Sequence, residues 1–189
     1  MRKLMALFLL SVPLLAAPKP RVKLSTSMGE VVIQLEPDAA PKTVANFLNY
    51  VHKGFYNGTI FHRVIPNFMI QGGGHLPDLK KKPADSSITN EADLAKGKGL
   101  LNTRGTITMA LPMGNPYGAT SQFFINVQDN PKLNFKAKTM TDFGYCPFGK
   151  VVQGMQVVDQ IRRVPTKTVG EFQNVPVKPV VILKAEEVK

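Results

Sequence analysis

Apolar and polar residues alternate near the start of the chain in a pattern that predicts a β-hairpin. From Val31 to Leu35 every second residue is a large aliphatic one, as a strand with one buried face requires. Another strand-like run, Val22–Thr26, precedes it, and Ser27-Met28-Gly29 between the two is typical of a turn. The domain is therefore expected to begin with two antiparallel strands.

An apolar stripe at helical spacing follows the hairpin and predicts a helix. The stripe consists of Val44, Phe47, Leu48 and Val51. Asp38 is placed to cap the N-terminus of this helix, and Pro41 suits its first turn. Gly54 is expected to end it, because glycine adopts the left-handed conformation that often follows a helix.

The next segments predict a broken strand and a long connection. Phe61–Gln71 has the composition of a strand that is interrupted at Pro66, because proline cannot donate a hydrogen bond inside a sheet. The stretch from Gly72 to about Arg104 is polar, and loops of that length in compact domains are usually functional or mobile.

The remaining apolar runs complete an all-β pattern. Further strands are expected at Thr106–Leu111, Gln122–Val127, Phe148–Val152 and Val180–Leu183. A second helix is expected over Met155–Arg163, ending before Pro165. About eight strands and two helices without a βαβ alternation favour a mainly β fold, because closing a sheet removes its exposed edges. The predicted architecture is a closed antiparallel eight-stranded β-barrel capped by two α-helices.

The N-terminal residues resemble a secretory signal peptide. Arg2 and Lys3 precede an apolar run, Leu4–Leu15, that is too short to span a bilayer, and Ala16-Ala17 follows. We expect a signal peptide over residues 1–16, or 1–17 as the alternative, a spacer over 17–21 and one domain over 22–189. The protein is then periplasmic or secreted, without a membrane anchor after cleavage. A buried first element of a cytoplasmic protein is the alternative.

Composition narrows the possible functions. The formal net charge is +11, but the basic residues are scattered, and Lys80-Lys81-Lys82 is the only run of three. Nucleic acid is therefore not expected as a partner. The single cysteine, Cys146, excludes an intramolecular disulfide and is interpreted as a packing residue.

The sequence carries no pattern for hydrolytic, metal or nucleotide chemistry. His52, His62 and His75 lack metal-ligand spacing, and no Gly-x-Ser-x-Gly elbow or carboxylate pair stands out. Gly144–Lys150 matches most of a P-loop, but Val151 replaces the Ser or Thr that would bind magnesium. No metal and no cofactor are expected.

Two stretches carry specific information. One is Phe61–Gly73, with the sequence FHRVIPNFMIQGG, and the other is Thr120–Ile125, which Phe148–Val151 follows. They resemble the signature segments of the cyclophilin family of peptidyl-prolyl cis/trans isomerases, and the resemblance extends from about residue 22 to 187. Asn90-Glu91-Ala92 and Asn102–Thr106 are similar to the bacterial, periplasmic branch.

The resemblance implies an enzyme that rotates X-Pro peptide bonds and assists the folding of exported proteins. It assigns catalysis to Arg63 and the positioning of that side chain to Gln71. It places the proline ring and the substrate chain against Phe68, Met69, Ala110, Leu111, Gln122, Phe124, Leu133 and Tyr145. A non-catalytic chaperone or interaction module that binds Pro-containing segments is the alternative. The enzyme is expected to be a monomer.

The chain departs from the better-known family pattern at several positions. Many eukaryotic members carry Trp where Lys132 stands, so weak or no cyclosporin binding is expected. Tyr145 replaces a histidine at the pocket rim, and Pro112 lacks a backbone N–H that could bind substrate. The segment 134–141 is longer than usual.

Overall fold

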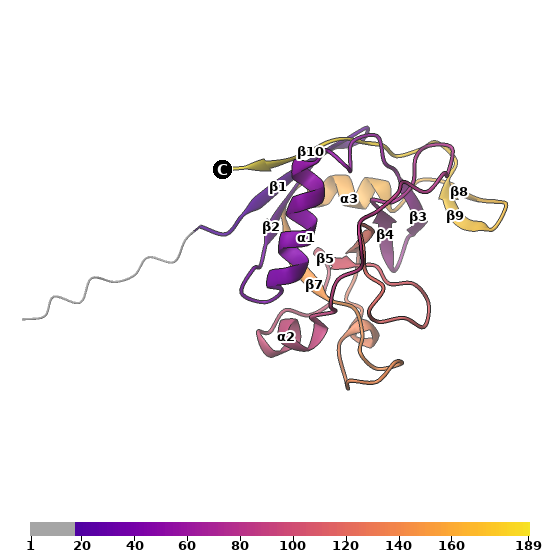
Figure 1. Cartoon of the computed structure of the whole chain (residues 1–189). Helices are drawn as coiled ribbons and strands as arrows, with labels where there is room; N and C mark the ends of the chain where they lie inside the picture. The colour runs from indigo at the N-terminus through magenta and orange to yellow at the C-terminus, as the bar shows by residue number, and fades with distance from the viewer. Residues whose placement is uncertain (1–17) are drawn as a thin grey trace, which may run out of the picture.

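The structure is a computed structural model that describes residues 18–189. Eight strands form one antiparallel sheet in the order β10-β1-β2-β7-β5-β6-β4-β3. These strands are β1 (Arg21–Thr26), β2 (Gly29–Leu35), β3 (Phe61–Ile65), β4 (Met69–Gly72), β5 (Thr106–Met109), β6 (Phe123–Asn126), β7 (Pro147–Gln153) and β10 (Ile182–Val188). The sheet curls around the core, as Figure 1 shows.

The predicted eight-stranded antiparallel fold is confirmed, but the barrel is only partly closed. β3 and β10 lie at opposite ends of the strand order, and one isolated bridge, Ile60 with Val181, joins the chain next to them. Beyond this bridge β3 lies against β9 (Phe172–Pro176), which pairs with β8 (Thr166–Val169) in a separate hairpin. This hairpin projects from the molecule beside β3 (Figure 1).

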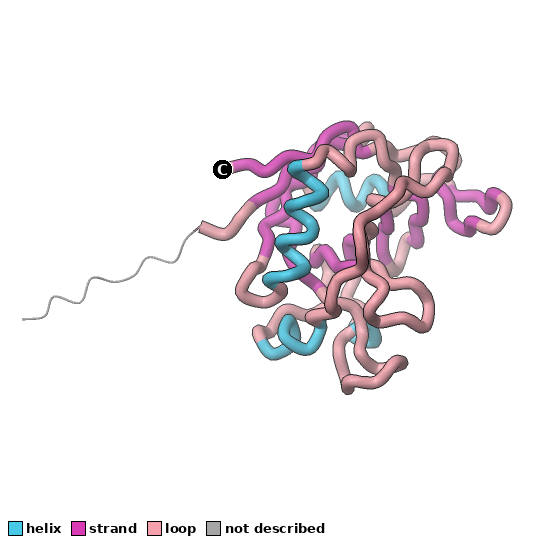
Figure 2. Tube along the Cα trace, in the orientation of Figure 1, coloured by secondary structure: helices cyan, strands magenta, loops and turns pink. Residues whose placement is uncertain are grey.

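Both predicted helices are present, as α1 (Pro41–His52) and α3 (Met155–Ile161). α1 contacts β10 and α3 contacts β2, and both helices are among the cyan segments in Figure 2. A short helix, α2 (Ala92–Gly97), and a 3-10 turn, η1 (Pro131–Leu133), were not predicted. Elements this short cannot display an apolar stripe, so periodicity does not reveal them.

The predicted N-terminal cap of α1 is wrong. The residue at the cap position is Ala40, and no side chain of the neighbouring residues caps the helix. Glu91 does so from a distant segment, since its carboxylate accepts hydrogen bonds from the backbone N–H of Lys42 at 3.1 Å and of Thr43 at 2.8 Å. At the other end Gly54 has a φ of +64°, as expected after a helix.

The core lies inside the curled sheet and beneath α1. Phe47 of α1 contacts Tyr56, Phe123 and Phe148, with ring centroids between 5.1 and 5.6 Å apart. All four of these side chains are fully buried. The apolar stripe that predicts α1 thus faces the core, which fixes the helix on the sheet. Cys146 is also buried, as its interpretation as a packing residue requires, and burial raises the pKa of its thiol to about 12.

Several predicted boundaries are wrong. The last strand begins at Ile182 and not at Val180, and it continues to Val188 because it pairs with β1 along its whole length. The stretch predicted as a loop up to Arg104 contains α2 and a small turn in which His75 bridges Lys81. The β8–β9 hairpin was missed because β8 is mostly exposed and neither strand has an apolar alternation.

The predicted signal peptide, over residues 1–16 or 1–17, lies outside the described residues. From residue 18 onward, the structure contains no helix with the length and apolar character needed to cross a membrane.

Candidate active site

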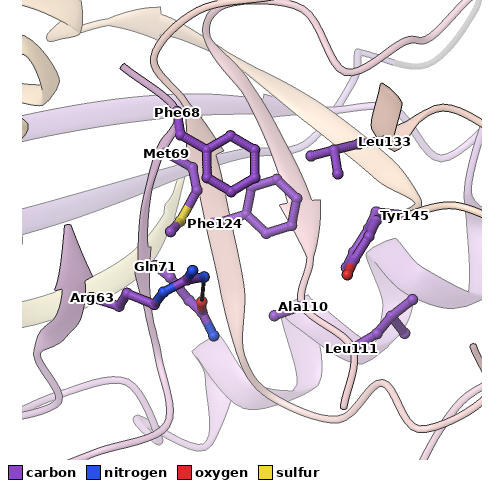
Figure 3. Close-up of a pocket in the computed structure, with 9 residues that line it drawn as sticks. All are labelled: Arg63, Phe68, Met69, Gln71, Ala110, Leu111, Phe124, Leu133 and Tyr145. Carbon is purple, nitrogen blue, oxygen red and sulfur yellow. Dashed lines mark hydrogen bonds between the residues drawn. The ribbon is translucent and has the colours of Figure 1, made fainter. Parts of the chain in front are cut away.

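A cavity of about 90 Å³ opens where β3, β4 and β6 meet the segments that follow β5 and precede β7. Figure 3 shows its lining: Arg63, Phe68, Met69, Gln71, Ala110, Leu111, Phe124, Leu133 and Tyr145. These nine are all residues that the sequence predicts for the site. The tenth, Gln122, lines a neighbouring cavity and contacts this one through Gln71. Five separate segments therefore bring the predicted residues together.

Arg63 and Gln71 face each other because β3 and β4 form a hairpin. The register pairs these two residues directly, and the Arg63 guanidinium donates a hydrogen bond of 3.4 Å to Oε1 of Gln71. The Gln71 amide in turn donates to Oε1 of Gln122 at 3.0 Å. No ion pair among residues 18–189 includes Arg63. Most of its donors thus stay available to a ligand.

The opposite side of the cavity is apolar. Met69 and Phe124 are 1% and 4% exposed and form its floor, while Phe68 and Leu133 complete the wall (Figure 3). Tyr145 stands edge-on to Phe124, with ring centroids 5.8 Å apart. The cavity therefore combines a planar cation on one side with a surface that suits a small apolar ring.

Ala110 and Leu111 form the rim beyond β5. The N–H of Ala110 donates to the carbonyl of Gln122 at 2.9 Å, which holds this segment against β6. Within the described chain, no hydrogen bond uses the carbonyl of Ala110 or the N–H of Leu111. An extended peptide could form backbone hydrogen bonds with these groups.

Comparisons with known proteins identify the family of this chain. The model of the family described as cyclophilin type peptidyl-prolyl cis-trans isomerase/CLD matches residues 21–187. This chain belongs to that family. The chain is 51% identical over 174 residues to peptidyl-prolyl cis-trans isomerase A of Dickeya dadantii, covering 92% of this chain and 87% of that protein. It is 51% identical to isomerase B of Escherichia coli, over 85% of this chain and 95% of the relative.

Solved cyclophilins share the fold. A crystal structure of a Cryptosporidium parvum cyclophilin type isomerase has a TM-score of 0.73 and 25% identity, and covers 90% of this chain and 98% of that one. The same protein in the presence of the dipeptide Ala-Pro gives a TM-score of 0.72, at 25% identity, over 89% of this chain and 99% of that chain. The chain is thus a cyclophilin-type isomerase by family and by fold.

A buried network of polar side chains lies beneath the wall of the cyclophilin cavity. No pattern in the sequence predicted it. The Asn126 amide donates to Oγ1 of Thr106 at 2.9 Å, and its oxygen accepts from Asn130 at 2.7 Å. Asn130 also donates to the carbonyl of Phe68 at 2.9 Å. Buried polar groups that are fully paired make a local structure rigid, so the network fixes the backbone of one cavity wall.

The opposite wall is held by the same network. Asn102 donates to the carbonyl of Tyr145 at 3.1 Å and accepts from the hydroxyl of Thr108 at 2.9 Å. Asn102 belongs to a segment that resembles the bacterial branch, which was the only sequence signal for it. Its position beneath Tyr145 depends on tertiary contacts that no local pattern shows.

A pair of buried histidines lies beside the cavity, and one of them, His62, belongs to β3. The rings of His62 and His75 are 4.3 Å apart, and Nδ1 of each is buried without a hydrogen-bond partner among the described residues. Burial, with smaller effects of His75 and Arg63, lowers the pKa of His62 from 6.5 to about 3. Burial, followed by the effect of Lys81, also lowers the pKa of His75. Neutral imidazoles are therefore part of the folded state near pH 7.

This arrangement predicts a loss of stability at mildly acidic pH. The unfolded chain binds a proton at His62 below pH 6.5, but the folded state does not until about pH 3. The contribution of His62 is thus complete above pH 6.5 and declines as the pH falls towards 3. Between pH 7 and pH 5 the protonation of His62 in the unfolded chain should lower the free energy of unfolding by about 2 kcal/mol, at about 1.4 kcal/mol per pH unit below pH 6.5. Urea unfolding at both pH values measures this loss.

The matched variant is His62→Phe, which keeps a ring of similar size and removes the titration. We expect it to lose about 2 kcal/mol less than the wild type between pH 7 and pH 5. Equal losses in the two proteins would show that His62 does not hold its neutral form in the folded state.

Proposed function

We propose that this isomerase catalyses X-Pro rotation with Arg63 as its catalytic residue and Gln71 as a positioning residue. The observation that carries this proposal is the Arg63 guanidinium, which has no carboxylate partner in the described chain and faces an apolar cavity. Family membership supports the reaction, and the side chains of this cavity support the assignment of roles.

The chemistry of the reaction suits such a site. Amide resonance makes the C–N bond partly double, and the barrier to rotation is about 18–20 kcal/mol. In the twisted state resonance is lost, and the proline nitrogen becomes pyramidal and basic. A fixed cationic donor that interacts better with the twisted group than with the planar one lowers the barrier. No nucleophile and no acid–base pair is required, since no bond of the chain is broken.

The remaining residues would orient the substrate. Phe68, Met69, Phe124 and Leu133 bind the proline ring in this proposal. The substrate chain runs past Ala110, Leu111 and Gln122, and the Tyr145 hydroxyl donates a hydrogen bond at the rim. Pro112 lacks an N–H, so the backbone contacts of the chain end at Leu111 on this side.

A peptide assay tests the proposal. Isomerisation of a short Pro-containing peptide is followed by a protease-coupled reaction with the purified mature protein. We expect turnover well above the uncatalysed rate. A protein that binds the peptide without accelerating its isomerisation would instead support the alternative of a chaperone or interaction module.

We also propose that the isomerase acts on exported proteins outside the cytoplasm. The support is the N-terminal sequence, in which Arg2 and Lys3 precede the apolar run Leu4–Leu15. Expression of the full chain in a Gram-negative host, followed by N-terminal sequencing of the periplasmic fraction, tests this. A new terminus at residue 17 or 18 is expected. An intact Met1 in the cytoplasmic fraction would refute export.

A monomer without nucleic-acid affinity is the form we propose for the mature enzyme. Many of its basic side chains have acidic partners, among them Lys23, Arg104 and Lys184. Elution from a size-exclusion column at the mass of one chain is expected. Salt-dependent retention on immobilised DNA would contradict the proposed absence of nucleic-acid affinity.

Cyclosporin should bind weakly because Lys132 stands where an aromatic wall is expected. Lys132 is exposed on the η1 turn, directly before Leu133 of the cavity. We expect Lys132→Trp to tighten cyclosporin binding about tenfold, since an aromatic side chain adds buried apolar area at the rim. Inhibition of peptide isomerisation measures the affinity. Lys136→Trp, on the same loop but outside the cavity lining, is the control and should leave the cyclosporin affinity unchanged.

A further inference from the structure

A second cavity, of about 250 Å³, adjoins the proposed proline site. The two share Gln71, Ala110 and Leu111, so a peptide bound in the first cavity can extend over the second. Lys81 and Gln122 also line this second cavity. What it selects depends on the charges and donors at its surface.

Lys81 differs from the two lysines beside it. Lys80 forms an ion pair with Asp78 at 3.1 Å. Lys82 donates to the carbonyl of Phe55 at 2.6 Å and lies over its ring. No hydrogen bond or ion pair within residues 18–189 involves the ammonium group of Lys81. Only Lys81 of this run therefore has its charge free at the cavity.

Backbone hydrogen bonds set the direction in which the Lys81 side chain points. Leu76 donates to the carbonyl of Lys80 at 3.0 Å, and Lys82 donates to the carbonyl of Gly74 at 2.9 Å. These bonds flank the antiparallel bridge between His75 and Lys81. Side chains alternate along an extended segment, so Lys81 projects to the opposite side from its neighbours. Of the three consecutive lysines, Lys81 alone thus places its charge at the second cavity.

Gln122 adds a neutral donor next to this cation. Its Oε1 accepts from Gln71, and its amide nitrogen donates no hydrogen bond within the described chain. The side chain lies against Gly74, where any Cβ would collide with it. Neither cavity is lined by an Asp or Glu, while Arg63 and Lys81 are both cationic. The two adjoining cavities therefore offer hydrogen-bond donors and positive charge, which suit a carboxylate.

We propose that Lys81 is a specificity-determining residue that favours substrates with an Asp or Glu close to the isomerised proline. The carboxylate enters the second cavity and pairs with Lys81, while Gln122 donates to its other oxygen. This inference rests on the proposed role of the first cavity, because the proline there fixes which neighbouring side chain reaches the second.

Peptides that differ at one position test the proposal. Glu, Gln or Lys is placed at each of the three positions on either side of the proline, and isomerisation is followed by NMR exchange, because a coupling protease would add its own preference. We expect Glu to raise kcat/KM about threefold to fivefold over Gln at one position, as a partly solvated ion pair allows. The ratio should fall at high salt.

Variants assign the effect to one side chain. The Glu-to-Gln ratio is the kcat/KM of the Glu peptide divided by that of the Gln peptide. It should fall to about one in Lys81→Ala and drop below one in Lys81→Glu. Lys80→Ala is the matched control, since it removes a neighbouring charge that points away, and it should keep the wild-type ratio. Each ratio is taken within a single protein sample, so a partial loss of folded enzyme cancels.

Two results would overturn the proposal. One is a Glu-to-Gln ratio near one at every position in the wild type, and the other is a ratio that survives in Lys81→Ala. Failure of the proposed catalytic function looks different, because the Gln peptides themselves would then not be isomerised.

Discussion

Arg63→Ala should lower kcat/KM for isomerisation of a Pro-containing peptide by about 10²–10³-fold, the usual cost of removing one fixed transition-state donor. In free-energy terms this loss is about 2.7–4 kcal/mol of barrier. The size follows from the site, where the guanidinium faces an apolar cavity and has Gln71 as its hydrogen-bond partner. The peptide assay measures the loss, and circular dichroism verifies that the fold survives.

Two further variants make this result specific. Arg63→Lys keeps the charge but loses the planar fork, so it should recover only part of the activity. Arg163→Ala removes an exposed arginine after α3, away from the cavity lining, and should retain wild-type activity. Near-normal turnover by Arg63→Ala would exclude the catalytic role assigned to that side chain.

Glu91→Ala should destabilise the protein by about 2–3 kcal/mol, the second largest effect that we expect. The Glu91 carboxylate accepts hydrogen bonds from two backbone N–H groups at the start of α1 and from the hydroxyl of Thr43 at 2.9 Å. Its negative charge also lies at the positive end of the helix dipole. Removing it leaves buried donors unpaired. Urea unfolding at pH 7 gives the change in stability, and the thermal midpoint should fall by roughly 5–10 °C.

The control comes from the failed sequence prediction. Asp38 was expected to cap α1, but it is exposed and forms no hydrogen bond with the helix. Asp38→Ala should therefore change the free energy of unfolding by less than about 0.5 kcal/mol. Equal effects of the two substitutions would mean that Glu91 does not act as the cap.

Local patterns predict elements whose residues contact the core directly. The alternation from Val31 to Leu35 and the stripe around Phe47 predict β2 and α1, because each of these elements buries one face. Pro66 likewise marks the turn between β3 and β4. The β8–β9 hairpin and α2 escape prediction, since the hairpin's strands lack an apolar alternation and α2 is too short.

The site residues were found through a motif and not through their individual properties. On composition alone Arg63 is one of 24 basic residues. The segment Phe61–Gly73 identifies it because several unusual neighbours occur together. The structure places nine of the ten predicted residues around one cavity, and Gln122 at the next. Their roles remain predictions, which the Arg63 variants test first.

The sequence by itself determined the antiparallel β architecture, the positions of α1 and α3, and the set of residues that forms the cavity. The architecture and the helices follow from periodicities within a few residues of chain, and the set of cavity residues follows from the resemblance to cyclophilins. The tertiary structure alone decided that Glu91 caps a helix 48 residues away, that the barrel stays partly open beside β9, and that Lys81 differs from its neighbours. Such features depend on partners that are distant in sequence, and distant partners leave no local period.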